Sequence, residues 1–104
     1  MIVATTDTLP GREIVEVLGV VFGSCVQTKH IGKDLRAAGR TIIGGESKPY
    51  TELMEEARRT AMQRMIEEAE KLDAHAIVGM RYATAQTMRG AAEIIAFGTA
   101  VRTQ

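Results

Sequence analysis

Three side chains that commonly ligate transition metals are scattered along the sequence: Cys25, His30 and His75. Zinc, copper and nickel sites need such ligands to converge within about 2.0–2.3 Å of the ion. The chain has no C-x-x-C and no H-x-x-x-H pair that would bring two ligands together. A lone cysteine in an apolar stretch is also typical of a small buried hydrophobe. The three residues are therefore candidate ligands for a divalent transition metal mainly if a ring gathers several copies of one histidine.

A second candidate site is the stretch GGESKPY, in which Gly44 and Gly45 precede a helical pattern. Glycine-rich loops that lead into helices can bind phosphate. Here the lysine and Ser/Thr of a Walker motif are missing, and so is a G-x-G-x-x-G fingerprint. Acidic residues around the helix start would also repel an anion. We therefore interpret Gly44, Gly45 and Ser47 as a turn and helix cap, with Tyr50 packing beside the helix start.

Nucleophilic catalysis requires a base within hydrogen-bond reach of the nucleophile and a group that orients that base. Ser24, Cys25, His30 and Asp34 are close in sequence, but no pattern dictates that they converge. We predict that the protein is not an enzyme. Because no arrangement of catalytic residues can be recognised in the sequence, we favour a binding or scaffold protein instead.

Length and composition indicate one domain that spans residues 1–104. The 13 basic and 13 acidic residues give zero formal net charge, so the phosphate-neutralising excess of nucleic-acid binders is missing. No apolar run approaches the ~20 residues of a membrane span, and the first residues do not resemble a signal peptide. We expect a cytoplasmic protein with no nucleic-acid or membrane partner.

The hydrophobic pattern predicts an α+β fold, with a small sheet of about three to four strands and one long helix. We expect strands at 2–4, 13–26, 75–85 and 91–103, a short helix at 30–40, and the long helix at roughly Thr51–Leu72. One face of that helix carries Met54, Ala57, Ala61, Met65, Ala69 and Leu72. Gly19 and Gly23 indicate a bulge or a close backbone contact in the second strand, and Gly90 suits a positive φ in a hairpin.

Two of these strands are apolar on both faces, which normally means burial on both sides. Strict alternation places Leu18, Val20 and Phe22 on one face and Val17 and Val21 on the other. One helix covers only one face, and a few strands leave two open edges. The pattern therefore favours a homo-oligomer. The alternative is a monomer in which residues 11–40 fold over the second face.

The stretches GGESKPYTELMEEARRTAM, EEAEKLDAHAIVGMRY and GTAV, together with GREIVEVLGVVFG, resemble the YbjQ-like family of small bacterial and archaeal proteins. The resemblance covers nearly the whole chain and implies a dodecin-like subunit in a ring-shaped pentamer. The family is often described as heavy-metal-binding. The resemblance therefore implies one alternative function, which is to bind a metal through ligands gathered at subunit interfaces. A nucleotide or flavin-type ligand in the ring is another. The chain departs from the family at Asp73, where a glycine is common, and at His75, where an acidic residue is common.

Overall fold

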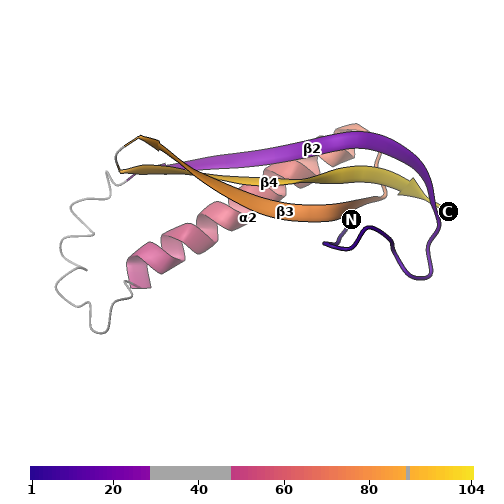
Figure 1. The fold of residues 1–104 in the computed structure, drawn as a ribbon, viewed down its shortest axis with the longest axis horizontal. Helices are drawn as coiled ribbons and strands as arrows, with labels where there is room; N and C mark the ends of the chain where they lie inside the picture. The colour runs from indigo at the N-terminus through magenta and orange to yellow at the C-terminus, as the bar shows by residue number, and fades with distance from the viewer. Residues whose placement is uncertain (29–47, 89) are drawn as a thin grey trace.

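The computed structural model describes residues 1–28, 48–88 and 90–104, which form a four-stranded sheet crossed on one face by a long helix (Figure 1). The elements are β1 (Ile2–Val3), β2 (Ile14–Thr28), α2 (Lys48–Lys71), β3 (Ala76–Met88) and β4 (Ala91–Thr103). The strand order is β1-β3-β4-β2, with β1 parallel to β3 and the other pairs antiparallel. The predicted α+β class and the four strands are confirmed.

The order of the strands follows from the connection through α2. β2 and β3 are consecutive strands on either side of the helix, yet β4 lies between them in the sheet. Both run antiparallel to β4, so they are parallel to each other, as in a split β-α-β unit. β2 is thereby left as an edge strand of the sheet.

The boundaries of the elements differ from the predictions mainly by extension. β4 has the predicted bounds, whereas β2 and β3 each continue further toward the hairpin end of the sheet. The helix begins at Lys48 instead of Thr51, because Pro49 is tolerated in a first helical turn. Gly90 has the positive φ expected in the hairpin, at 83°. The predicted short helix at residues 30–40 lies outside the described residues.

The buried face of α2 is made of small and flexible side chains. Ala57, Ala61, Met65 and Ala69 are fully buried against the sheet, as the periodicity predicts. Leu72 was predicted on this face, but it is 45% exposed because the helix has already ended. The amides of Asp73 and Ala74 donate to the carbonyls of Glu70 and Ala69, at 3.0 and 3.1 Å. These two hydrogen bonds form a Schellman motif at the end of the helix, in which Asp73 adopts the left-handed conformation at φ 57°.

Gly23 lets the helix approach the sheet closely. A Cβ at this position would overlap the backbone of Ala61 and Met65 on α2. The predicted close backbone contact is therefore confirmed at Gly23. The absence of a side chain there brings β2 and α2 together at the centre of the main core.

Gly19 changes the alternation of β2, and this corrects one prediction. A register shift against β4 lies between Val17 and Gly19, where Gly19 has φ 126°. Because the bulge adds a residue, Val17 and Val20 share one face of the sheet, whereas strict alternation placed them on opposite faces. Leu18 packs against the core beneath the helix.

The sheet face opposite α2, called the open face below, is covered only in part. Leu9 of the N-terminal segment packs there with Ala76, Val78 and Val101 in a small second core. The monomer alternative, in which residues 11–40 fold over this face, is wrong for residues 14–28, because they form β2 itself. The rest of that range from residue 29 lies outside the described residues.

The molecule is elongated for its length. The radius of gyration is 17.0 Å, whereas a compact domain of this size has about 13 Å. Within the described parts of the chain, no helix combines the length and apolarity needed to cross a membrane.

Candidate functional site

A row of exposed apolar side chains follows β2 on the open face of the sheet. This row, called the β2 strip, consists of Val17, Val20, Phe22 and Val26, which are 66%, 60%, 58% and 53% exposed. Ser24 lies on the same face between Phe22 and Val26 and is the one polar residue in the row. Exposed apolar residues are common singly, but several along one strand are typical of a contact surface.

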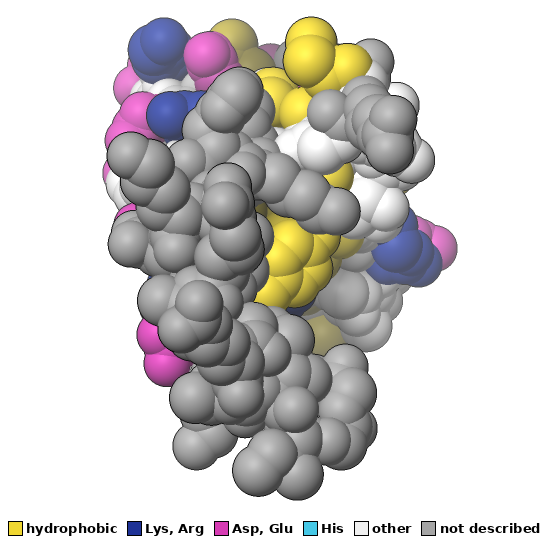
Figure 2. Space-filling model, turned by 90° about the vertical axis from the view of Figure 1, so that its left-hand side faces the viewer, with side chains coloured by type: hydrophobic (Ala, Val, Ile, Leu, Met, Phe, Trp, Pro, Cys, Tyr) yellow, Lys and Arg dark blue, Asp and Glu magenta, His cyan; other side chains and the backbone are white. Residues whose placement is uncertain are grey.

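The register of β2 explains why these residues lie together. Val20, Phe22 and Val26 are paired with Thr99, Phe97 and Glu93 of β4, and paired residues lie on the same face. The alternate residues Val21, Gly23 and Cys25 face α2 and are buried. Since β2 is at the edge of the sheet, no described strand flanks the strip on its other side. Figure 2 shows hydrophobic side chains at the surface of the hairpin end of the molecule.

A recess of about 480 Å³ continues from the strip around the edge of β2 toward α2. Val20 and Phe22 belong both to the strip and to the wall of this recess. Glu68, Lys71 and Leu72 line it from the end of the helix, and Lys71 Nζ lies 3.5 Å from Glu68 Oε1. The recess therefore joins an apolar strand edge to a polar helix end. An apolar centre beside a polar rim is typical of protein–protein interfaces.

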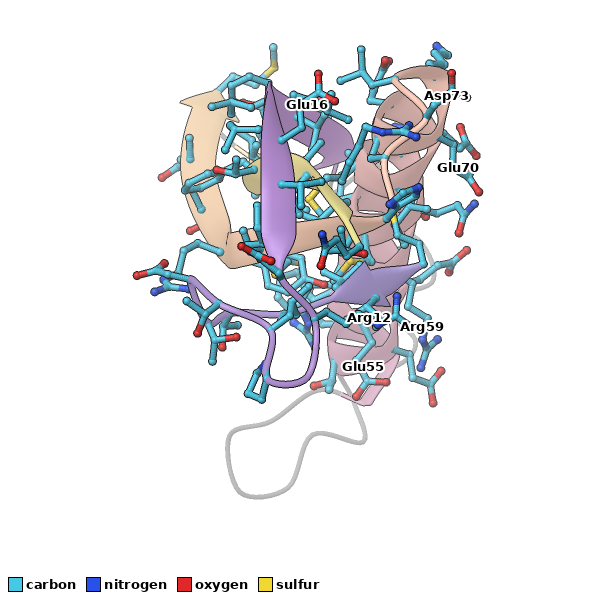
Figure 3. The ribbon with its side chains drawn as sticks, turned by 90° about the vertical axis from the view of Figure 1, so that its right-hand side faces the viewer. Arg12, Glu16, Glu55, Arg59, Glu70 and Asp73 are labelled. Carbon is cyan, nitrogen blue, oxygen red and sulfur yellow. The ribbon has the colours of Figure 1, made fainter. Side chains whose placement is uncertain are left out.

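A second, shallow recess of about 650 Å³ lies where the helix ends. Its walls are Met1, Glu70, Asp73, Ala74, His75 and Arg102. Arg102 Nη1 donates to the carbonyl of Asp73 at 2.6 Å, and its Nε lies 3.8 Å from Glu16 Oε1. Figure 3 shows Glu70 and Asp73 at the end of α2, with their side chains pointing away from the strands.

The two predicted metal ligands that the structure describes, Cys25 and His75, lie far apart. Cys25 is buried opposite Ile94, whereas His75 contacts the backbone of Thr103. Ile94 and Thr103 are nine positions apart on β4, a distance of about 30 Å along an extended strand. His30 lies outside the described residues. No group of three or more His, Cys, Asp or Glu side chains in the described ranges could hold a metal ion.

The remaining predicted site residues concern the turn before α2. Gly44, Gly45 and Ser47 lie outside the described residues, so the turn and cap stay predictions. Tyr50 is in the first turn of α2 and is 38% exposed. Of the four residues considered for nucleophilic catalysis, His30 and Asp34 also lie outside the described ranges.

Sequence reasoning missed the β2 strip as a defined set, although it predicted apolar β-surface in excess of what one helix covers. The signal that could have found the strip was Gly19. Reading it as a bulge, and shifting the alternation by one residue after it, places Val17, Val20 and Phe22 on one face.

Comparisons with known proteins agree on the family. A family model named YbjQ, with the description "Putative heavy-metal-binding", matches residues 1–104. The chain is 58% identical to a UPF0145 protein of Fervidobacterium nodosum over 98% of its length and 94% of the relative's. It is 55% identical to a UPF0145 protein of Archaeoglobus fulgidus, with the same coverage of both chains.

One solved structure supports the fold. A protein of unknown function from Pediococcus pentosaceus, assigned to the DUF74 family, superposes with a TM-score of 0.67 at 17% identity. The match covers 100% of this chain and 98% of the other. Given the full-length match to the family model and the close relatives, the chain belongs to the YbjQ family.

Proposed function

We propose that this protein is a non-enzymatic, homo-oligomeric scaffold or binding protein whose copies cover one another's open sheet face. The observation that carries this proposal is the β2 strip, four apolar side chains that are each more than half exposed. Water-exposed apolar surface of this kind is stabilised when a partner covers it. The elongated shape of one chain supports the same conclusion.

The strip alone supplies a moderate part of the binding free energy. Its exposed fractions amount to a little over two complete side chains, and covering them contributes about 4–7 kcal/mol. Association costs about 4–15 kcal/mol in lost freedom. A stable assembly therefore needs further contacts, and the outer edge of β2 has no neighbouring strand among the described residues.

The resemblance to the YbjQ family supports five copies in a ring, each with a dodecin-like fold. In a ring, each copy uses two different surfaces, one toward each neighbour. Each subunit is therefore held by two contacts, so a moderate free energy per contact suffices. Any ligand then binds at subunit interfaces or in the central pore, because the two recesses formed by described residues are shallow.

Replacing Phe22 by Ser tests the role of the strip. Phe22 is 58% exposed, so losing its burial costs about 1.4 kcal/mol per contact, or about a tenfold weaker association. Sedimentation velocity over a dilution series is expected to show dissociation at a correspondingly higher concentration.

The matched control is Gln63→Ser, which also replaces an exposed side chain by serine, but on α2. We expect it to sediment like the wild type. Equal dissociation midpoints for Phe22→Ser and the wild type, or an equal loss in the control, would refute the role of the strip.

A further inference from the structure

We infer that His75 and Cys25 are structural residues, and that neither of them supplies the ligand that the heavy-metal description of the family model calls for. His75 is assigned as a main-chain acceptor that joins the end of β4 to the connection between α2 and β3. Cys25 is assigned as a packing residue of the main core. The two assignments rest on different contacts.

The backbone of Thr103 has no paired residue in β3, because the pairing of β3 with β4 ends at Ala76 and Val101. The amide of Gln104, the residue next to Thr103, donates to the carbonyl of Glu13, so the backbone of Gln104 is directed toward the segment that leads into β2. Because successive residues of a strand direct their polar groups to opposite sides, those of Thr103 point toward β3. β3 begins only at Ala76, and the amide of Ala74 already donates to Ala69 in the helix ending.

The imidazole of His75 fills this position. The Thr103 amide donates to His75 Nδ1 at 2.9 Å, and the Thr103 carbonyl lies 3.1 Å from the same nitrogen. Because the Thr103 amide makes the shorter contact with Nδ1, we assign Nδ1 as the acceptor, which places the proton of a neutral ring on Nε2. The ring thus stands in for the missing strand residue. It lets β4 continue past the beginning of β3.

Metal ligation conflicts with this arrangement at either nitrogen. A metal at Nδ1 would displace the Thr103 amide directly. A metal at Nε2 requires the ring proton to move to Nδ1, where it can serve the carbonyl but leaves the amide facing a donor. Thr103 is only 7% exposed, so water does not readily replace the lost acceptor. Either mode of ligation leaves a buried amide without its partner.

Cys25 is unsuited for a different reason. It lies on the helix-facing side of β2, opposite Ile94, and is 7% exposed within the main core. Its one polar contact among the described residues is with Gln27 Nε2, at 3.5 Å from Sγ. A stable metal site needs several ligands, and Cys25 belongs to no group of three or more His, Cys, Asp or Glu side chains among the described residues.

Two substitutions of His75 test the role of Nδ1, the hydrogen-bond acceptor, independently of the role of Nε2. The Oδ1 of His75→Asn can occupy the place of Nδ1, whereas His75→Gln carries its polar atoms further out, near the place of Nε2. We expect amide hydrogen exchange at Thr103 in His75→Asn to match the wild type. Exchange in His75→Gln should be about tenfold faster. Equal exchange in the two variants would overturn the assignment.

Metal binding is tested by equilibrium dialysis of the assembled protein against zinc, copper or nickel, followed by elemental analysis. The wild type, His75→Asn and Cys25→Ala are expected to retain equal amounts of each metal, whatever that amount is. His75→Asn keeps the backbone contact, so a loss of metal in this variant cannot be ascribed to misfolding. One metal per chain in the wild type that is lost in His75→Asn or in folded Cys25→Ala would overturn the inference.

Discussion

The packing of β2 on α2 makes a strong prediction at Gly23. In Gly23→Ala, the new methyl group would overlap the carbonyl oxygen of Ala61 and the amide nitrogen of Met65. These are backbone atoms in the middle of a helix, so no side-chain rotation relieves the overlap. The φ of Gly23 is not in the left-handed region, so the penalty is steric and not conformational.

The helix must therefore move away from the sheet along the fully buried row that contains Ala57 and Met65. Overpacking of a close-packed core costs about 1–3 kcal/mol, and we expect the upper part of this range because the whole helix has to shift. Urea denaturation followed by circular dichroism measures this loss in the free energy of unfolding.

The neighbouring substitution Ser24→Ala is the control. Ser24 is exposed, and its contact with the helix is made by its backbone carbonyl, which the substitution keeps. Its free energy of unfolding should stay within about 0.5 kcal/mol of the wild type. A Gly23→Ala protein as stable as the Ser24→Ala protein would refute the close contact between β2 and α2.

Four further substitutions test individual contacts and turns by the same denaturation assay. Arg64→Ala removes the 2.6 Å hydrogen bond to the Ser24 carbonyl and should cost about 1 kcal/mol. Arg59→Ala loses only an exposed 3.6 Å ion pair and should cost less than about 0.5 kcal/mol, so equal losses would contradict the assigned contact. Asp73→Gly should raise the free energy of unfolding by about 0.5–1 kcal/mol, because glycine adopts the left-handed helix ending without steric cost, and a loss of stability would count against it. Gly90→Ala should lower stability by about 1 kcal/mol at the positive φ of the hairpin, and an unchanged protein would be inconsistent with that turn.

Much of the fold follows from local patterns in the sequence. The three- and four-residue spacing of alanine and methionine predicts the buried face of α2, because the helical period alone decides which residues meet the sheet. β4 is preceded by Gly90 and ends at polar residues, so the sequence predicted both of its bounds. Asp73 stands where the YbjQ-like family commonly has a glycine, and its positive φ is the conformation that glycine usually supplies at a helix end.

The parts that sequence reasoning missed depend on tertiary contacts. The insertion of β4 between β2 and β3 is a property of the sheet and leaves no periodic signal. Alternation failed at Gly19 because a glycine permits a bulge without showing which residue it displaces. His75 was considered as a metal ligand, and its bond to Thr103 joins residues 28 positions apart, which no local pattern reveals.

The mass of the wild-type protein in solution tests the central claim most directly. Light scattering coupled to size-exclusion chromatography at micromolar concentration should give a multiple of the 11.3 kDa chain, and five copies if the ring is pentameric. A single species of 11.3 kDa that persists as the concentration is raised would contradict the account. The β2 strip would then be exposed in the functional protein, and mutual covering of the open sheet face would be excluded.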